Sequence, residues 1–407
     1  AAATYGVAFD PEGRFDLDKM KALVEEKEVK DEKSSDKIAV EIEAPELCKR
    51  YIGRVVRNVK IGPSPLWLQK RLRSRNINAI NNIVDITNYV MLEFGTPQHA
   101  FDYDKLNGYL CVRYAKENET LVTIDEVERK LTADKTVVIA TREQPVCAAG
   151  VFGGLNSEID DNTTNIALEA AYFTSAQNRK SAHSIGYHSD AASRYERGID
   201  IEMVEPALYH SIELLEKYAG AEFVGISKTG DNKARLNEIT LRNSEIKRIL
   251  GIEIPQERSI EILENLGFKL LGKNELAAKF STPSYRQNDV SREIDLIEEV
   301  VRIEGFDKVT PCVPNISQGA DISLDTKIMK TVNQIMLSYG FDEIITSSLV
   351  GENLCNLYLQ PLDKNCEIKV MNPASEDFST LRQQLAPSLL EVVKNNFARI
   401  ACSLKRG

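Results

Sequence analysis

Hydrophobic and polar positions along the chain predict short strands that alternate with helices. Runs rich in β-branched and aromatic residues, bounded by turn residues, predict strands at 51–59, 110–114, 136–140, 150–152 and 165–168. Apolar residues at helical spacing predict helices at 66–74, 81–94, 176–185 and 203–219. Together these elements predict a large mixed α+β domain over residues 45–230.

Residues 235–310 predict a smaller unit. A strand is followed by two short helices, a hairpin and a third helix over about 290–305. This order is typical of a winged-helix-like module.

The two ends of the chain have different patterns. Residues 1–44 are dense in charge and predict a helix over 19–37 that leads into a linker, as in the remnant of an upstream domain. Residues 320–407 predict an amphipathic helix, strands at 343–350 and 367–371, and a final helix from about residue 388. The fold class predicted from the whole chain is α+β, divided among several domains.

Composition and charge narrow the range of functions. The chain has 407 residues, 43% hydrophobic and 28% charged, which is unlike a disordered tail, a fibre or a disulfide-rich miniprotein. Its net charge of -10 predicts that any contact with nucleic acid is local or shared with another chain. No apolar run approaches the roughly 20 residues of a membrane helix, so no membrane partner is expected.

Sequence motifs disfavour several kinds of site. The seven cysteines are widely spaced without a CxxC pair, which disfavours a zinc ribbon or a disulfide framework and predicts a reducing, cytoplasmic compartment. The sequence contains neither GxxxxGK[ST] nor a strand-adjacent GxGxxG, so it supports neither a P-loop nor a dinucleotide site.

The segment IVDITNYVMLEFGTPQHAFDYDKL (83–106) places polar groups beside a turn. Thr87 and Asn88 lie on a predicted helix that breaks at Gly95, shortly before His99. An unperturbed imidazole is mostly neutral at pH 7 and can accept a proton or orient a water. The alternative is a histidine that only bonds a backbone carbonyl in a packed turn.

A second candidate segment runs from Cys147 to Phe173. Gly150 and its neighbouring glycines let a ligand approach the backbone closely, and Glu169 interrupts an apolar strand-to-helix stretch. A carboxylate there needs a partner, because burying it unpaired is costly. It could accept a hydrogen bond from a ligand hydroxyl, or pair with an arginine or a helix N-terminus of the protein itself.

SPLWLQKRLRSRN (64–76) gathers positive charge. Ser64 is predicted to cap a helix that carries the basic residues, and no acidic residue occurs between Gly62 and Val84. In an acidic protein this is a candidate contact for phosphate, and the alternative is a solvated basic face. The basic residues are Lys70, Arg71, Arg73 and Arg75.

PSYRQNDVSREIDLIEEVVRIEGFDKV (283–309) gathers negative charge. Its predicted helix has an apolar stripe formed by Ile294, Ile297 and Val301. Carboxylates on the opposite face, with one before the helix, could hold Mg²⁺ together with waters or groups of a partner, or could form a solvated acidic face. These carboxylates are Asp289, Asp295, Glu298 and Glu299.

At these motifs the chain resembles the beta subunit of bacterial phenylalanine–tRNA ligase. The resemblance runs from about Val40 to the end of the sequence. Its most specific blocks are GPSPLWLQKRL, IVDITNYVMLEFGTPQHAFD, AAGVFGG, IALEAAYF, SRYERGID, TPSYRQNDVSREIDLIEEVVRIEGFDKV and NPASEDFSTLRQQLAPSLLEVVKNN.

The resemblance implies an enzyme of two alpha and two beta subunits that acts on tRNA(Phe). The alpha subunit would use ATP to join phenylalanine to the tRNA, and the beta subunit would hydrolyse tyrosine joined to it by mistake. Residues 45–230 would be the editing domain, 235–310 the winged-helix-like module and 320–407 the start of a non-catalytic class II synthetase-like domain. The OB-fold and anticodon-binding regions of the family do not occur in this sequence, so the chain resembles a fragment.

The resemblance also implies roles for individual residues. Glu169 matches the position that reads the tyrosine hydroxyl. Positions around the terminal adenosine and the attacking water match His99, Thr87 and Asn88, and the small-residue wall of the site matches Ala149 and Gly150. A Mg²⁺ site shared with the alpha subunit matches Asp289, Asp295, Glu298 and Glu299.

One departure from the family pattern concerns a positive charge. Many relatives carry Arg-Pro where this chain has Asn78 and Ala79. A cationic contact in the editing site is therefore missing or supplied by another residue, such as Arg73 or Arg75.

A separate editing site has a physical rationale. An apolar pocket built for phenylalanine rejects an added hydroxyl only ~10²-fold, so a second site that hydrogen-bonds this hydroxyl is useful. The alternative function is a non-catalytic scaffold that binds a partner subunit and nucleic acid. A Glu169 that is fully paired within the protein, with no cleft beside His99, would indicate the scaffold.

Overall fold

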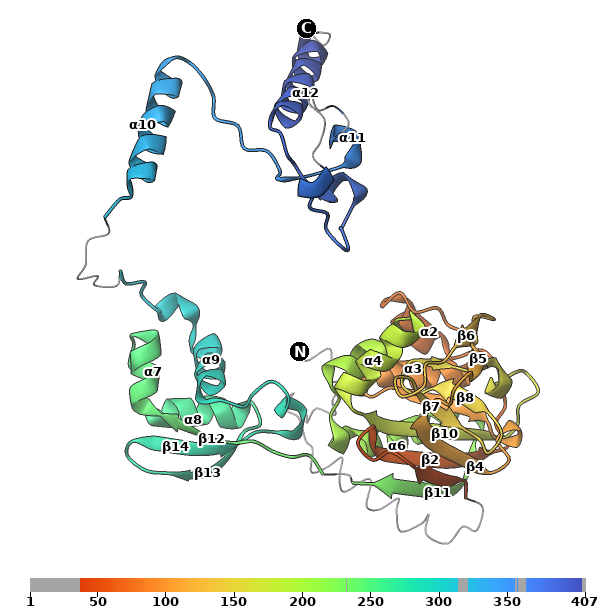
Figure 1. Ribbon diagram of the computed structural model, residues 1–407. Coiled ribbons are helices and arrows are strands. Elements are labelled where there is room, and N and C mark those ends of the chain that lie inside the picture. The colour runs from red at the N-terminus through yellow and green to blue at the C-terminus, as the bar shows by residue number, and fades with distance from the viewer. Residues whose placement is uncertain (1–36, 232, 314–320, 356, 358–363, 405–407) are drawn as a thin grey trace. The chain divides into compact units, whose positions relative to one another are not determined.

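The computed structural model describes residues 37–231, 233–313, 321–355, 357 and 364–404. The helix predicted over 19–37 lies outside these residues, apart from its last position. The chain divides into two compact units between Pro311 and Cys312, and the described residues have the predicted mixed α+β character (Figure 1).

Two sheets form the framework of residues 37–231. In the five-stranded sheet β1 pairs parallel with β4, whereas all other neighbours are antiparallel. Its strands, in spatial order, are β1 (Ala39–Ile42), β4 (Tyr109–Tyr114), β7 (Val137–Ala140), β8 (Pro145–Ala148) and β9 (Phe152–Gly153). The four-stranded antiparallel sheet consists of β11 (Glu222–Gly230), β2 (Cys48–Arg57), β10 (Ile166–Phe173) and β3 (Gln98–Asp102). A separate hairpin is formed by β5 (Thr120–Val122) and β6 (Glu128–Lys130).

Helices cover these sheets. They are α2 (Leu66–Arg73), α3 (Asn82–Phe94), α4 (Ser175–Ile185), α5 (Asp190–Arg197) and α6 (Val204–Ala219), with short 3-10 turns η1 (Tyr103–Lys105), η2 (Leu155–Ser157) and η3 (Ile201–Met203). α3 begins where the Asn81 side chain accepts hydrogen bonds from the first helical amides, and it ends at Gly95, which adopts a left-handed φ of 71°. α6 packs on β10 and also against α3.

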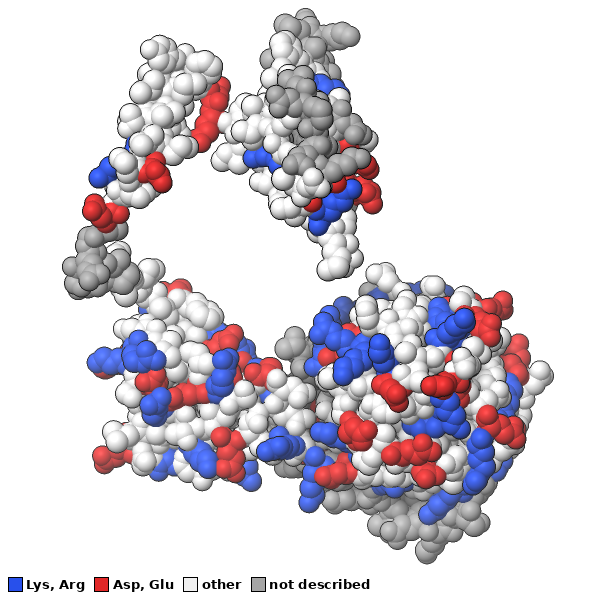
Figure 2. Space-filling model, in the orientation of Figure 1, with Lys and Arg blue, Asp and Glu red and all other residues white. Residues whose placement is uncertain are grey.

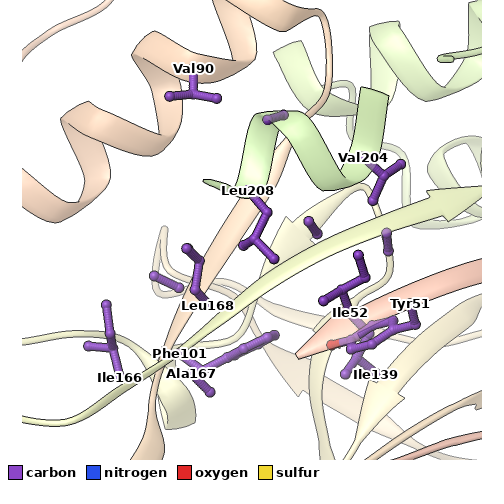
Figure 3. Packing of buried hydrophobic residues seen from close by; sticks show 14 of the residues in the cluster. Tyr51, Ile52, Val90, Phe101, Ile139, Ile166, Ala167, Leu168, Val204 and Leu208 are labelled. Atoms are coloured by element: carbon purple, nitrogen blue, oxygen red, sulfur yellow. The ribbon is translucent and has the colours of Figure 1, made fainter. Parts of the chain in front are cut away.

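The core fills both faces of the four-stranded sheet. Figure 3 shows Leu168 of β10 with Val90 of α3 and Leu208 of α6, while Tyr51 of β2 lies with Ile139 of β7. Side chains alternate along a strand, so the residue that follows Leu168 points away from the two helices and toward the five-stranded sheet. The next position along β10 is Glu169.

Residues 237–311 form a smaller module. Its elements are β12 (Glu238–Arg242), α7 (Asn243–Leu250), α8 (Gln256–Asn265), β13 (Lys269–Lys273), β14 (Ala277–Ser281), η4 (Ser284–Arg286), α9 (Glu293–Glu304) and η5 (Phe306–Lys308). The sheet order is β12-β14-β13, and this succession of elements agrees with the one expected for a winged-helix-like module. A buried hydrogen bond of 2.7 Å from the Ser284 hydroxyl to Asp200 connects η4 to the larger domain.

The second unit contains α10 (Leu324–Ser338), β15 (Leu349–Val350), α11 (Glu352–Cys355), η6 (Lys364–Cys366), η7 (Glu376–Phe378), β16 (Thr380–Leu381) and α12 (Ala386–Leu404). The two strands predicted here are largely wrong. In the range 343–350 only Leu349–Val350 is a strand, and in the range 367–371 only Lys369 makes an isolated bridge to Thr380. Neither range continues into a ladder that would hold the rest of it extended.

Several details of the larger domain also differ from the predictions. The strand expected at 150–152 is replaced by a turn at Gly150 and the short β9. The expected change from strand to helix at Glu169 does not occur, because β10 continues to Phe173. Part of the expected linker at 1–44 forms β1, and α5 was not predicted. Across the described ranges, every helix is too short or too polar to cross a membrane.

Candidate functional site

Glu169 and His99 are directly opposite each other on neighbouring strands. They are partners in the antiparallel ladder between β10 and β3, so their side chains leave the same face of the sheet. On the other side of β10 the partner of Glu169 is Gly53, and the Ile38 and Val40 side chains fill the space where a side chain of Gly53 would lie. The structure therefore brings together the two residues that the sequence had placed in separate segments.

The Glu169 carboxyl is nearly inaccessible and incompletely bonded. Only 5% of the residue is exposed, and its Oε2 atom has no hydrogen-bond partner within the described residues. Burial raises the pKa of Glu169 from 4.5 to about 8, because an ionised carboxylate is poorly solvated there. At neutral pH the group is therefore mostly a carboxylic acid, which can donate a hydrogen bond as well as accept one.

His99 is also uncharged near neutral pH. The residue as a whole is half-buried, its ring packs edge-on against Phe101 at 4.5 Å between centroids, and burial of the imidazole lowers its pKa from 6.5 to about 4. A methyl group on Gly153 would lie 2.7 Å from its Cε1 and 2.9 Å from its Nε2. The ring therefore rests directly on the backbone of β9.

Side chains of other elements pack against Ala149 and Gly150, which are the predicted small-residue wall of the site. Gly150 has a left-handed φ of 65°, and a Cβ there would lie 2.5 Å from the Asn178 amide and 2.9 Å from the rings of Phe173 and Tyr195. Ala149 is buried, and its carbonyl accepts a hydrogen bond of 3.2 Å from the same Asn178 amide. Glycine is thus required at position 150 both by conformation and by space.

Two tyrosines near this wall had not been singled out from the sequence. The Tyr195 hydroxyl lies 3.1 Å from the Ala171 carbonyl oxygen, and Glu169 lies near enough to add to the raised pKa of Tyr195 and of Tyr51. The larger cause of both raised pKa values is burial. The Tyr51 hydroxyl has no partner within the described residues. In the sequence, Tyr195 lies within SRYERGID, one of the blocks that resemble the family. No motif or spacing pattern indicated a role for Tyr51.

Thr87 and Asn88 lie on α3, which packs against β3. The Thr87 hydroxyl donates a hydrogen bond of 2.8 Å to the Val84 carbonyl of the same helix. Among the described residues, no hydrogen bond joins Thr87 or Asn88 to Glu169 or His99, so their assignment to the site stays a prediction.

The basic helix α2 differs from its predicted form in one respect. Ser64 does not cap it, because the Ser64 hydroxyl instead donates a hydrogen bond of 2.6 Å to the buried Asp85 carboxylate. The Arg71 guanidinium lies over the rings of Trp67 and Tyr89, at 5.4 and 5.6 Å from their centroids. Lys70, Arg73 and Arg75 are left near or on the surface, along with Asn78 and Ala79, which replace the family's Arg-Pro.

The carboxylates predicted to hold Mg²⁺ do not form a cation site in the described chain. Glu299 is buried between Arg286 at 2.8 Å and Arg302 at 2.5 Å, and although burial opposes ionisation, these hydrogen bonds keep the pKa of Glu299 below its usual value. No group of three or more potential ligands occurs within the described ranges. A cation would have to displace both arginines, so these residues do not fit the ion.

The orientation of α9 explains this difference. Ile294, predicted to lie in the apolar stripe, is exposed, whereas Asp295 is buried and accepts hydrogen bonds from the backbone amides of Ser291 and Arg292. Glu298 is exposed, and Asp289 is exposed and pairs with Arg286 at 2.8 Å. The four carboxylates therefore lie in separate environments.

Comparison with known families divides the chain into three matches. Residues 47–220 match the B3/4 domain, residues 239–306 match the tRNA synthetase B5 domain, and residues 310–405 match the phenylalanyl tRNA synthetase beta chain CLM domain. This combination defines the class of protein as an aminoacyl-tRNA synthetase chain.

Individual relatives narrow this class further. The chain is 39% identical over 366 residues to the phenylalanine–tRNA ligase beta subunit of Carboxydothermus hydrogenoformans, and 40% identical over 366 residues to that of Geobacillus kaustophilus. These alignments cover 88% and 89% of this chain and 45% of each relative. The beta subunit of Halalkalibacterium halodurans is 37% identical over 399 residues, which is 97% of this chain and 49% of that protein.

The chain belongs to the phenylalanine–tRNA ligase beta-subunit family. It spans about half the length of the curated relatives it matches. A solved N-terminal fragment of the phenylalanyl-tRNA synthetase beta-subunit from Pyrococcus horikoshii aligns with 66% of this chain and 74% of its own, at 14% identity. Its TM-score of 0.31 is too low to establish a shared fold.

Proposed function

We propose that this chain works within a phenylalanine–tRNA ligase as the part that hydrolyses tyrosine wrongly esterified to tRNA(Phe). The alpha subunit would carry out the ATP-dependent charging with phenylalanine. The observation that supports this proposal most strongly is the cross-strand pair of Glu169 and His99, in which one carboxyl oxygen has no hydrogen-bond partner in the described part of the chain.

Selection of tyrosine would depend on the Glu169 carboxyl. A phenol hydroxyl can bond the unpartnered Oε2, whereas phenylalanine would leave this atom buried and unsatisfied. Because Glu169 is almost inaccessible, the amino acid would enter beside the partly exposed His99, on the side where β3 is the edge strand of its sheet.

Hydrolysis requires a water placed against the ester carbonyl. The water oxygen would bond to the carbonyl carbon, the bond from this carbon to the ribose oxygen would break, and the ribose oxygen would take up a proton. An imidazole with a pKa of about 4 is a weak base, so His99 would orient the water by a hydrogen bond rather than hold its proton. The amides of Ala149 and Val151 already donate to backbone carbonyls, so in this turn the Gly150 amide would stabilise the negative charge that develops on the carbonyl oxygen.

The test measures ester loss from tyrosyl-tRNA(Phe) and phenylalanyl-tRNA(Phe), using this chain assembled with the alpha subunit. Glu169→Ala should slow the release of tyrosine, raise the release of phenylalanine, or do both. Glu143→Gln, which changes an exposed carboxylate in the same domain, is the matched control and should behave as wild type. The assigned role is wrong if Glu169→Ala releases tyrosine at the wild-type rate and phenylalanine no faster.

Partner binding is a second function, which one observation favours. Helix α10 exposes a row of apolar side chains, formed by Ile328, Val332, Ile335 and Met336. We propose that the second unit uses this face to bind the alpha subunit. Co-purification should be lost on Val332→Glu and kept on Lys330→Glu, and it should persist without Mg²⁺ because two arginines hold Glu299. Equal retention of both variants would argue against the α10 face.

A further inference from the structure

A pocket of about 450 Å³ lies between α4 and α5, and neither Glu169 nor His99 lines it. Its walls come from the last turns of α4, the connection that follows and the last turn of α5. The lining residues are Arg179, Ala182, His183, Gly186, Tyr187, His188 and Glu196.

The pocket lies in a part of this acidic chain that lacks acidic residues. No aspartate or glutamate occurs from Ala170 to Ser189. Arg179 and His183 are exposed and lie one helical turn apart on α4, and within the described ranges Arg179 makes no ion pair. Glu196 is the one acidic group in the lining, and it faces His188 at 3.5 Å. Figure 2 shows Lys and Arg side chains gathered over the region of α4.

The aromatic wall of the pocket is held rigidly. The Tyr187 ring packs against Phe152 at 4.2 Å between centroids, and the Arg129 guanidinium lies 5.2 Å from the Tyr187 ring. Arg129 is itself held by two hydrogen bonds to Asp125, of 2.8 and 2.7 Å. The Tyr187 ring is half-buried, is held by Phe152 and Arg129, and lines the pocket. A planar base can stack on such a ring.

The aromatic wall of the pocket is directly connected to the candidate editing site. Phe152 is followed by Gly153, on whose backbone the His99 ring rests. Ser189, at the start of α5, donates a hydrogen bond of 2.7 Å to the carbonyl of Val151, so the pocket and β9 are fixed to each other. A ligand that extends from the site along β9 would reach Tyr187 next.

We propose that the α4–α5 pocket binds an unpaired nucleotide of the tRNA whose esterified end occupies the Glu169–His99 site. Its base stacks on Tyr187, and its phosphate contacts Arg179 and His183. This assignment rests on the proposed editing function, and it explains how a chain of net negative charge holds RNA through a local basic surface. The pocket contacts the backbone and one base face, so it holds the strand in place without reading its sequence.

Binding is measured by fluorescence anisotropy with a labelled single-stranded RNA pentanucleotide ending in CCA, on the chain assembled with the alpha subunit. Tyr187→Ala should weaken binding about fivefold or more, whereas Tyr187→Phe keeps the ring and should bind as wild type. Arg179→Gln should weaken binding and reduce the slope of log K against log salt by about 0.7, the value for one phosphate of a single strand. Lys116→Gln removes one exposed charge outside the pocket and should change nothing.

Ester release separates this inference from the proposed function. Tyr187→Ala and Arg179→Gln should raise the KM for tyrosyl-tRNA(Phe) with little change in kcat. Unchanged KM and unchanged RNA binding in both variants would overturn the pocket assignment, even if Glu169→Ala abolishes the selection of tyrosine. Displacement of the RNA by an acidic peptide as readily as by unlabelled RNA would also overturn it. Normal RNA binding, together with a Glu169→Ala variant that releases tyrosine at the wild-type rate and phenylalanine no faster, would instead overturn the proposed role of Glu169 alone.

Discussion

The buried Glu169 carboxyl should make the stability of its domain fall as the pH rises. Its pKa is about 8 in the folded protein and about 4.5 when solvated, so between these values the folded state holds a proton that the unfolded state has lost. The free energy of unfolding then decreases by ~1.36 kcal/mol for each pH unit. The stabilisation is complete below pH 4.5 and is lost as the pH rises through 8.

His99 has the opposite effect on stability at lower pH. Its folded pKa of about 4 lies below the ordinary 6.5, so the unfolded state binds the extra proton and stability is lost as the pH falls below 6.5. Above pH 6.5 the imidazole is neutral in both states. From pH 6.5 to pH 8, the contribution of Glu169 should therefore lower the free energy of unfolding by about 1.5–2 kcal/mol.

Glu169→Gln keeps the shape of the side chain and removes its ionisation. Urea unfolding can be followed by the fluorescence of Trp67, the single tryptophan of the sequence, which packs in this domain against Tyr89 at 5.3 Å. The difference between wild type and Glu169→Gln should change by about 1.5–2 kcal/mol over this pH range, because all other groups cancel. The exposed Glu143→Gln should show no such change. If plots of the free energy of unfolding against pH were parallel for wild type and Glu169→Gln, they would refute a buried carboxyl that holds a proton in this range.

Three further changes test the surroundings of the pair and the α9 carboxylates. Gly153→Ala should displace the His99 ring and slow tyrosine release at least about tenfold, while the melting temperature changes little. Unimpaired release would show that the ring position is unimportant. Gly150→Ala should lower stability by about 2 kcal/mol or more in thermal unfolding, because of its positive φ and its crowded surroundings. A melting temperature equal to wild type would contradict this packing. Glu299→Gln should destabilise its module by about 1.5–3 kcal/mol, because it weakens the charged hydrogen bonds of a buried carboxylate with the half-buried Arg286 and the exposed Arg302, whereas Glu298→Gln should stay within about 0.5 kcal/mol. Stabilisation of wild type by millimolar Mg²⁺ in the same melts would instead favour a metal site.

Local patterns predicted the helices of the larger domain well. The α3 helix was expected at 81–94 and runs over Asn82–Phe94, because its cap at Asn81 and its stop at Gly95 are encoded by neighbouring residues. The same reasoning found only the first part of β10, predicted at 165–168, because the residues of this strand are all buried and show no alternation of polar and apolar positions. A strand covered on both faces cannot be distinguished from other buried segments by its periodicity.

Local sequence patterns could not predict the parts of the site that depend on contacts between distant segments of the chain. The strand register that places Glu169 opposite His99 is a contact between segments about 70 residues apart, and only the family resemblance linked them. The Mg²⁺ prediction treated the α9 carboxylates as free, whereas Arg286, from a separate 3-10 turn, neutralises Glu299. Such pairings follow from tertiary packing, which one chain segment cannot reveal.

Because β3 pairs with β10, the number of residues between α3 and β3 matters to the site as much as the identity of its side chains. A shift of one residue in β3 would bring Gln98 or Ala100 opposite Glu169 and turn the imidazole toward the helix-covered face. A single deletion between Gly95 and His99 should therefore abolish the site while leaving every chemical group present. In evolution and in engineering, this short turn should tolerate substitutions more readily than insertions or deletions.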